Sequence, residues 1–218
     1  MDTREFTSIS LFKGMSETEI GRLLELLQAE EYRFLKGNRI FSAGERTSRM
    51  GVVLEGSVTI ESNDIWGNRT ILNLIESGTV FAETYALLEN EPMLVDAVAN
   101  EDSRIVLLNA GRKKMIRYGT EAWMMKYITN FLSIAVRKNL NLSGRSFHTA
   151  PKTIRGRVMS YLNAVALQKQ TNAFEIPFDR QQLADYLNLD RSALSKELGK
   201  MQREGLITVK KNRFTIVT

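Results

Sequence analysis

The sequence contains no cysteine and only one histidine, His148, among its 218 residues. Without cysteine there can be no disulfide, no thiol switch and no Cys-ligated zinc or iron–sulfur site. With one histidine, a His-rich metal site and a His-based catalytic triad are equally hard to build, and we interpret His148 as part of a linker. We therefore expect no metal and no cofactor.

The sequence also lacks any stretch close to the roughly 20 uninterrupted apolar residues that a membrane-spanning helix needs. Its first residues, Met-Asp-Thr-Arg-Glu, do not have the charged-then-apolar layout of a signal peptide. No nucleophile–base constellation and no phosphate-cradling Gly-Lys-Ser/Thr loop is found. These absences predict a cytoplasmic protein that is not an enzyme and has no membrane partner.

Positive charge is concentrated in the C-terminal third of the chain. From Gly144 onward there are 13 Lys and Arg residues against 6 Asp and Glu, whereas residues 1–143 contain 17 against 19. A DNA-binding segment needs such an excess of cations to neutralise phosphates. The charge distribution therefore predicts that the C-terminal segment binds nucleic acid.

The residues from Asp179 to Arg213 have the pattern of a winged helix-turn-helix. Asp179 and Gln182 form a capping-box-like pair at the start of a short helix. Asp190 can cap a second helix, which has a buried stripe at i, i+4 and i+7 formed by Leu194, Leu198 and Met201. The spacing predicts two short helices joined by a tight turn.

A basic β-hairpin is predicted after the second helix. Gly205 occupies a helix C-cap position, and residues 206–209 and 214–217 have the pattern of two strands. The turn between them, residues 210–213, reads Lys-Lys-Asn-Arg. We interpret it as a wing that lies on a phosphate backbone.

The exposed face of the second helix carries small, polar and cationic residues, which suits base edges in the major groove. The predicted DNA-binding residues are Arg180, Gln181, Arg191, Ser192, Ser195, Lys196, Lys210, Lys211 and Arg213. A solvated helix face would have a similar composition. The alternative interpretation is a small helical hairpin with no role in nucleic-acid binding.

The N-terminal half is predicted to contain one short helix and many short strands. Ser16 and Glu19 fit a capping box, and one apolar helical face follows, formed by Ile20, Leu23, Leu24 and Leu27. Glycine turns then separate apolar or alternating runs at 39–41, 50–54, 57–61, 69–74, 95–98 and 104–108. Such spacing predicts a β-roll or barrel. Trp66-Gly67-Asn68 is interpreted as a hairpin turn without a function.

A long helix of about 22 residues, ~33 Å in length, is predicted between Glu121 and Leu142. It has two adjacent apolar faces, one through Met124 and Phe131 and the other through Leu132 and Val136. One face can cover the β-roll while the other meets a partner helix, which predicts a homodimer. A single wide face buried within one subunit is the alternative. The segment Thr149-Ala150-Pro151 ends the helix and marks the domain boundary.

This order of elements resembles the Crp/Fnr family of bacterial transcription regulators over almost the whole chain. The similar motifs are residues 43–47, 52–58 and 78–83 in the N-terminal half and 178–184 and 190–198 in the C-terminal half. The resemblance implies an α+β protein with an N-terminal double-stranded, jelly-roll-like β-roll (1–118), a long dimerisation helix and hinge (119–148) and a C-terminal winged helix-turn-helix (149–218). It also implies that Arg191, Ser192, Ser195 and Lys196 occupy base-reading or adjacent positions.

The sequence departs from the family in the effector cassette. Members that bind cyclic AMP resemble one another in a Gly-Glu pair, followed about ten residues later by an Arg-Ser pair that neutralises the cyclic phosphate. Here Ala82-Glu83 and Met93-Leu94 stand at these positions, and no Lys or Arg occurs between Thr70 and Ser103. A buried phosphate without a cation is strongly unfavourable. We therefore expect an effector other than cyclic AMP.

The candidate effector-pocket residues are Glu83, Tyr85, Met93, Leu142 and Ser143. The resemblance implies that Leu142 and Ser143 occupy the positions of the Thr-Ser pair that contacts the adenine in family members that bind cyclic AMP. A filled core with Glu83 capping a turn is the alternative. The expected partners are double-stranded DNA, a second copy, a possible small-molecule effector, and RNA polymerase if the protein is an activator. The alternative function is a cyclic-nucleotide-binding regulatory module whose winged domain contacts protein.

Overall fold

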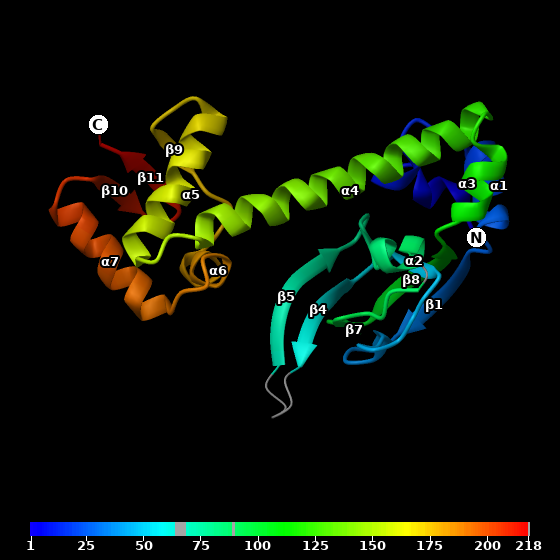
Figure 1. Ribbon diagram of the computed structural model, residues 1–218, viewed down its shortest axis with the longest axis horizontal. Helices are drawn as coiled ribbons and strands as arrows, with labels where there is room; N and C mark the ends of the chain where they lie inside the picture. The colour runs from blue at the N-terminus through cyan, green and yellow to red at the C-terminus, as the bar shows by residue number, and fades with distance from the viewer. Residues whose placement is uncertain (64–68, 89, 218) are drawn as a thin grey trace. The chain divides into compact units, whose positions relative to one another are not determined.

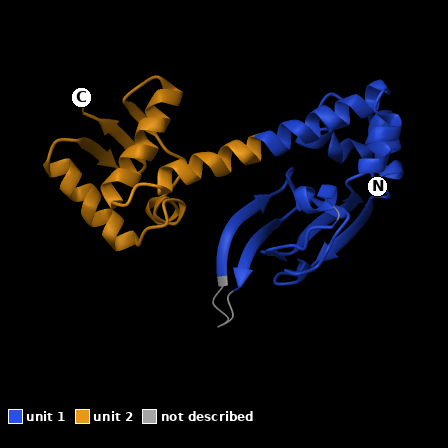
Figure 2. Ribbon diagram, viewed as in Figure 1, with its two compact units in different colours: residues 1–136 blue, residues 137–218 orange. Residues whose placement is uncertain are grey.

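The computed structural model describes residues 1–63, 69–88 and 90–217, so the predicted turn at 66–68 lies outside the described residues. Its elements are coloured along the chain in Figure 1. The chain divides into two compact units, residues 1–136 and 137–218, and the division falls inside the long helix α4 (Ala122–Thr149) (Figure 2). The predicted α+β class is confirmed. Among the described residues, no helix is both long and apolar enough to cross a membrane.

Unit 1 is built on two antiparallel four-stranded sheets with the strand orders β1-β8-β3-β6 and β2-β7-β4-β5. The strands are β1 (Glu30–Phe34), β2 (Arg39–Phe41), β3 (Arg49–Glu55), β4 (Ser57–Asn63), β5 (Arg69–Glu76), β6 (Val80–Phe81), β7 (Asp96–Ala99) and β8 (Ser103–Asn109). Six of them overlap the predicted apolar runs. Gly56 joins β3 to β4 at φ +80°, where a Cβ atom would lie 2.4 Å from the hydroxyl of Ser103. Only glycine fits this turn without a shift.

The two sheets bury an apolar core between their facing sides. It contains Val53, Ile105 and Leu107 from one sheet and Val58, Ile75 and Ala97 from the other, together with Phe41, Phe81 and Met93. Phe81 lies directly on Gly51, since a Cβ atom at Gly51 would be 2.2 Å from the ring. The inside of the β-roll is therefore filled by side chains at this point.

A second core covers the outer side of β3 and β8 with helical segments. These are η1 (Thr3–Phe6), η2 (Ser10–Phe12), α1 (Glu17–Leu26), α3 (Arg112–Tyr118) and the first half of α4; the short α2 (Glu83–Leu88) follows β6. The predicted capping box of Ser16 and Glu19 is present at the start of α1. From α4, Trp123, Met124, Tyr127 and Phe131 are buried in this core.

Helix α4 is 28 residues long and extends seven residues beyond the predicted end at Leu142. It ends at Thr149, ahead of Pro151, as the proline predicts. The first predicted face is buried in part through Met124 and Phe131, whereas Met125, Leu132, Val136 and Leu140 are 47%, 60%, 57% and 69% exposed. Within this chain, the helix therefore leaves an apolar stripe without cover.

Unit 2 is a small helical fold closed by a three-stranded antiparallel sheet of order β10-β11-β9. After α4 it contains α5 (Ile154–Lys169), β9 (Ala173–Glu175), α6 (Arg180–Tyr186), α7 (Arg191–Arg203), β10 (Ile207–Lys210) and β11 (Arg213–Ile216). The predicted hairpin turn is narrower than expected, because Lys210 and Arg213 pair across the strands and only Lys211 and Asn212 form the turn. Strands β10 and β11 lie one residue away from the predicted ranges. Strand β9 and helices α2 and α3 were not predicted.

Candidate nucleic-acid interface

Helix α7 is positioned by a local cap at its start and by an apolar stripe along its inner side. Asp190 caps it by accepting a hydrogen bond from the backbone N–H of Ala193 at 2.8 Å. Hydrogen bonds from the hydroxyl of Ser192 and from the backbone N–H of Ala193 hold the pKa of Asp190 below its usual value. Leu194, Leu198 and Met201 are buried at their predicted spacing. Full burial of one such side chain contributes about 1.5–3 kcal/mol, so the orientation of the helix is well determined.

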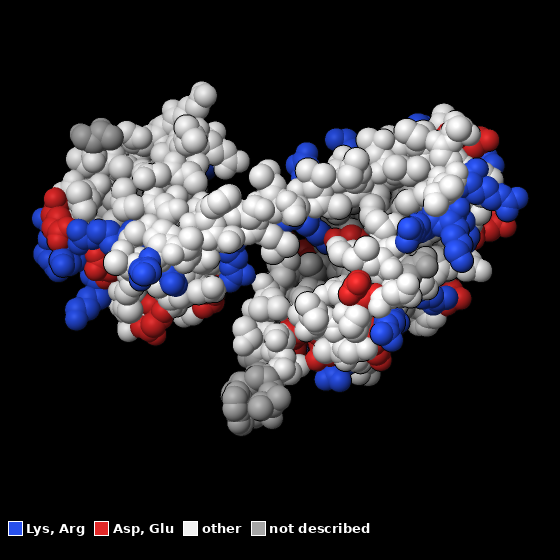
Figure 3. All heavy atoms as spheres, viewed as in Figure 1, with Lys and Arg blue, Asp and Glu red and all other residues white. Residues whose placement is uncertain are grey.

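The opposite side of α7 carries the four predicted base-reading residues, and all of them are exposed or partly exposed: Arg191, Ser192, Ser195 and Lys196. They occupy the first two turns, within about 7.5 Å along the helix axis. Figure 3 shows Lys and Arg side chains interspersed with Asp and Glu side chains on the part of unit 2 that contains α7 and β10. The four predicted residues thus lie together on the exposed start of α7.

Helix α6 precedes α7 and begins with the predicted capping box. Asp179 accepts from the N–H of Gln182 at 2.8 Å, and the Gln182 side chain accepts from the N–H of Asp179 at 2.8 Å. The exposed Gln181 donates to Asp185 one turn later on the same helix. The predicted contact residue Gln181 is therefore already engaged with a carboxylate.

Arg180 lies between α6 and the wing and is only partly exposed. It donates to the carbonyl of Lys211 at 3.4 Å, and its guanidinium lies 5.9 Å from the ring centroid of Phe214. The pKa of Arg180 is lowered, mainly by desolvation and to a smaller extent by repulsion from Arg191. Its Nη1 atom is buried and has no hydrogen-bond partner among the described residues. A buried donor without an acceptor is unfavourable unless a ligand supplies one.

The wing is fixed at its base and carries its cations at its tip. Asn212 donates from its side chain to the carbonyl of Ile176 at 3.2 Å, and the N–H of Ile176 donates to the carbonyl of Asn212 at 3.0 Å. Lys210 and Lys211 are exposed. Arg213 is also exposed but forms an ion pair with Glu175 of β9. Arg213 is thus less available than the two lysines for a phosphate.

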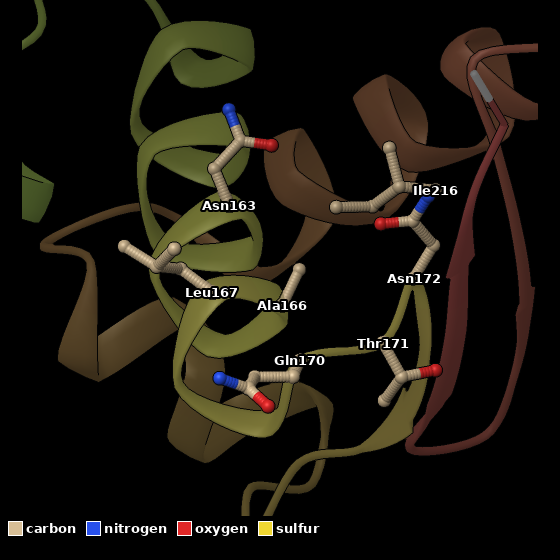
Figure 4. Close-up of a pocket in the computed structure, with 7 residues that line it drawn as sticks. All are labelled: Asn163, Ala166, Leu167, Gln170, Thr171, Asn172 and Ile216. Carbon is tan, nitrogen blue, oxygen red and sulfur yellow. The ribbon is translucent and has the colours of Figure 1, made fainter.

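A hollow on another part of unit 2 has no charged side chain among the residues that line it. It lies between the C-terminal end of α5, the following loop and β11, and Figure 4 shows the amides of Asn163, Gln170 and Asn172 around it. The other lining residues are Ala166, Leu167, Thr171 and Ile216. Because phosphate binding needs cations, this hollow is not suited to a DNA backbone.

Comparison with known proteins identifies two domains in this order. A family model for a cyclic nucleotide-binding domain matches residues 31–114, and one for a Crp-like helix-turn-helix domain matches residues 156–218. The transcriptional activator protein FnrL of Cereibacter sphaeroides is 30% identical over 93 residues, which are 38% of this chain and 35% of that protein. The aligned part thus spans about a third of the length of this relative.

The chain belongs to the Crp/Fnr family of transcription regulators. Two solved structures share its fold. The catabolite activator protein of Thermus thermophilus is 22% identical, with a TM-score of 0.50 and a coverage of 95% of this chain and 93% of that one. The c-di-GMP-responsive global regulator CLP of Xanthomonas campestris is 15% identical, with a TM-score of 0.58 and a coverage of 93% and 100%.

The effector cassette of this Crp/Fnr protein lies at α2 and in the loop before β7. Ala82 has φ +60°, a left-handed conformation in which alanine is about 1 kcal/mol less favourable than glycine. Glu83 is buried at the start of α2, and Met93 is buried in the core of the β-roll. Of the five candidate pocket residues, these two and Tyr85 therefore lie in unit 1.

At Met93 and Leu94, the backbone of the cassette is already hydrogen-bonded. The N–H of Met93 donates to the carbonyl of Glu45 at 2.8 Å, and its carbonyl accepts from Gly44 at 2.7 Å. The N–H of Leu94 donates to the Tyr85 hydroxyl at 3.3 Å. These donors are therefore not free to hold a phosphate.

The remaining two candidate residues lie in the part of α4 that belongs to unit 2: Leu142 is 69% exposed and Ser143 is partly exposed.

One cation near the cassette was missed by sequence reasoning. Arg46 donates to the carbonyl of Asn90 at 2.9 Å, although it precedes the cation-free stretch by more than twenty residues. Across the described residues, no group of three or more His, Cys, Asp and Glu side chains is placed to hold a metal ion.

Proposed function

We propose that this Crp/Fnr protein is a sequence-specific DNA-binding regulator that acts as a homodimer on a palindromic operator and responds to a small molecule other than cyclic AMP. Residues 1–118 form the sensor, 119–148 the dimerisation helix and hinge, and 149–218 the DNA reader. RNA polymerase is a further partner if the protein activates transcription. The exposed polar and cationic tip of α7, backed by a buried apolar stripe, is the observation that carries this proposal.

Base reading is assigned to Arg191, Ser192, Ser195 and Lys196. Their span of about 7.5 Å matches about two base-pair steps of 3.4 Å, which suits direct contacts at two or three neighbouring pairs. Arg191 and Lys196 can donate to guanine, and the serine hydroxyls can bond to any base. The small serines also allow the helix to approach the groove closely.

Phosphate contacts are assigned to Arg180, Gln181, Lys210, Lys211 and Arg213. A phosphate oxygen next to the guanidinium of Arg180 would offset the repulsion between Arg180 and Arg191. The exposed Lys210 and Lys211 can follow the backbone on the other side of the groove. Arg213 would have to leave Glu175 first, so its contribution is expected to be the smallest of the three wing cations.

Dimerisation is assigned to the exposed stripe of Met125, Leu132, Val136 and Leu140 on α4. Their spacing of seven, four and four residues keeps them on one side of the helix, as in a coiled-coil seam. A parallel or antiparallel partner helix would remove this apolar surface from water. Two readers in one dimer fit a palindrome with half-sites about one helical turn apart.

An effector other than cyclic AMP is favoured by the interior of the β-roll. Phe41, Phe81 and Met93 occupy the space between the two sheets, and the cassette N–H groups of Met93 and Leu94 are used within the protein. A cyclic phosphate there would have to displace these bonds, and the nearby cation Arg46 already donates to the carbonyl of Asn90. Any effector would act by binding one orientation of the readers more tightly than another.

Selection of duplexes from a random DNA pool by the purified protein tests the central proposal. We expect enrichment of a palindromic sequence. On that sequence, Arg191→Ala and Lys196→Ala should each reduce the preference over scrambled DNA by about 5- to 150-fold, the value of a base contact of 1–3 kcal/mol. Arg203→Ala, which removes an exposed cation from the last turn of α7, is the control. Equal losses on selected and scrambled DNA would contradict the base-reading assignment.

Sedimentation velocity tests the dimer. Leu132→Glu places a charge in the middle of the stripe, and we expect it to shift the protein from dimer to monomer. Asn141→Glu, at an exposed polar position on the opposite side of the same helix, is the charge control and should leave the dimer intact. A wild type that sediments as a monomer would contradict the proposed seam.

Titration with cyclic AMP and cyclic GMP tests the alternative function. Tight saturable binding would favour a nucleotide-binding module and contradict our interpretation of Met93. We expect neither nucleotide to bind in this way. The nearby Arg46 already donates to the carbonyl of Asn90, and the N–H groups of Met93 and Leu94 are bonded within the protein, so a cyclic phosphate would have to displace these bonds.

A further inference from the structure

The C-terminal end of α4 is hydrogen-bonded to the first helix of the DNA reader. The Arg145 guanidinium donates to the carbonyl of Tyr186 at 3.0 Å, to the carbonyl of Asp185 at 3.0 Å and to the side-chain oxygen of Asn188 at 3.1 Å. These acceptors lie at the C-terminal end of α6, where carbonyls lack partners within the helix and a cation is favoured. One side chain of α4 thus binds three neighbouring acceptors on the reader.

A second contact from the same end of α4 engages the side chain of Tyr186. The His148 Nδ1 atom lies 3.0 Å from the Tyr186 hydroxyl. The rings of His148 and Tyr161 of α5 also pack in a T-shaped arrangement, with centroids 5.4 Å apart at 80°. Tyr186 is therefore held by α4 at both its backbone carbonyl and its hydroxyl.

Arg157 of α5 holds the same turn from another direction. It donates to the carbonyls of Leu187 at 3.1 Å and Asn188 at 2.9 Å, and to the carbonyl of Pro151 at 2.9 Å. Four consecutive carbonyls, those of residues 185–188, therefore accept from either Arg145 or Arg157. Asn188 has φ +52°, which makes the bend between α6 and α7 possible. The two arginines fix the bend that sets the direction of α7.

We propose that Arg145 and His148 are positioning residues that make the end of α4 a rigid part of the DNA reader. The segment 150–153 between α4 and α5 is bridged on both sides, by these two residues and by the bond from Arg157 to Pro151. A change in the twist of α4 near Arg145 is then transmitted to α6 and α7 without being absorbed by a free hinge at Pro151. This inference rests on the proposed DNA-binding function.

The test compares the wild-type protein with Arg145→Gln, Arg145→Lys and the control Arg137→Gln, an exposed cation of α4. Each full-length protein is titrated with the duplex that the wild type selects from a random pool and with a scrambled duplex. We expect Arg145→Gln to weaken binding of the selected duplex by about tenfold, the value of one or two hydrogen bonds from a charged donor, with little effect on scrambled DNA. Arg145→Lys should not restore it, because a lysine cannot form the forked set of bonds.

Each outcome is decisive. If Arg145→Gln weakens binding of the selected and the scrambled duplex equally, Arg145 acts by its charge and the inference is wrong. Any effect of the control Arg137→Gln should have this form. Full rescue by lysine contradicts it in the same way. If the wild type selects no sequence, the proposed function fails, and the coupling is then judged from hydrogen exchange alone.

Hydrogen exchange measures the coupling without DNA. Loss of Arg145 should accelerate exchange of the amides of residues 186–189 in α6 and the turn, with no change in β10. Tyr186→Phe removes only the bond to His148 and provides a milder variant in case Arg145→Gln does not fold. We expect it to accelerate exchange in the same segment by a smaller factor. Unchanged exchange in both variants would overturn the inference.

Discussion

The salt dependence of DNA binding should distinguish the wing tip from other cations of unit 2. Lys211 is exposed at the turn between β10 and β11 and has φ +58°. Alanine at such a position adds strain of about 1–2 kcal/mol, whereas asparagine adopts this conformation more readily. Lys211→Asn therefore removes one cation while preserving the turn.

The expected size of the effect follows from counterion release. One phosphate contact contributes about 0.9 to the slope of log affinity against log salt. A variant that lacks one phosphate contact loses less affinity than the wild type when salt is added. When the salt concentration rises fourfold, from 50 to 200 mM, the ratio of wild-type to variant affinity should therefore fall by about 3.5-fold. Fluorescence anisotropy with a labelled duplex at four salt concentrations measures this slope.

Arg203→Gln is the matched control for Lys211→Asn. It removes the same charge at the exposed C-terminal end of α7, about 18 Å along the helix from Arg191. This distance exceeds the Debye length of about 8–10 Å, so its effect on the slope should be small. Equal slope changes in the two variants, or an unchanged slope in Lys211→Asn, would refute a phosphate contact at the wing tip.

Three further predictions concern stability. Leu198→Ala should lower the free energy of unfolding by about 2–5 kcal/mol in urea titrations, because Leu198 is 2% exposed in the core of unit 2. Gly51→Ala should destabilise the β-roll by about 1–3 kcal/mol through its clash with Phe81, and Phe81→Leu should relieve part of this loss in a double-mutant cycle. Desolvation lowers the pKa of His148 in the folded state, so the unfolded chain binds the proton more readily. The wild type should therefore exceed His148→Gln in free energy of unfolding by the full amount above about pH 6.5, and this difference should shrink as the pH falls through the pKa of the folded state. A difference that does not change with pH would contradict this.

Local signals in the sequence were sufficient to predict the helices of the reader. The capping boxes at Ser16 and Asp179 act within four residues, and both are present in the structure. The apolar stripe of α7 is equally local, because a helix brings i, i+4 and i+7 together whatever surrounds it. For the same reason the glycine-separated strands of the β-roll could be recognised, and the family models agree with this order of domains.

The parts that the sequence did not predict depend on contacts between distant residues. Strand β9 is only three residues long and exists because Phe174 pairs with Phe214 of β11, forty residues later. The extra turns of α4 after Leu142 have few apolar residues, and the bonds of Arg145 to residues 185–188 help to hold them. No spacing in the sequence indicates that Arg145 and Asn188 meet.

The exposed stripe of α4 runs from the part of the helix that belongs to unit 1 into the part that belongs to unit 2. Residues up to Ile134 pack into the core of unit 1, and the last turns are bonded to α6 through Arg145. The exposed Val136 and Leu140 follow Ile134 along the helix and precede Arg145. A partner helix on the proposed stripe would therefore contact α4 close to the part that is bonded to the reader. Because the far end is fixed to the reader, a small change in how two α4 helices pack there would alter the direction of α7, which makes the proposed dimer seam the place where an effector signal can reach DNA.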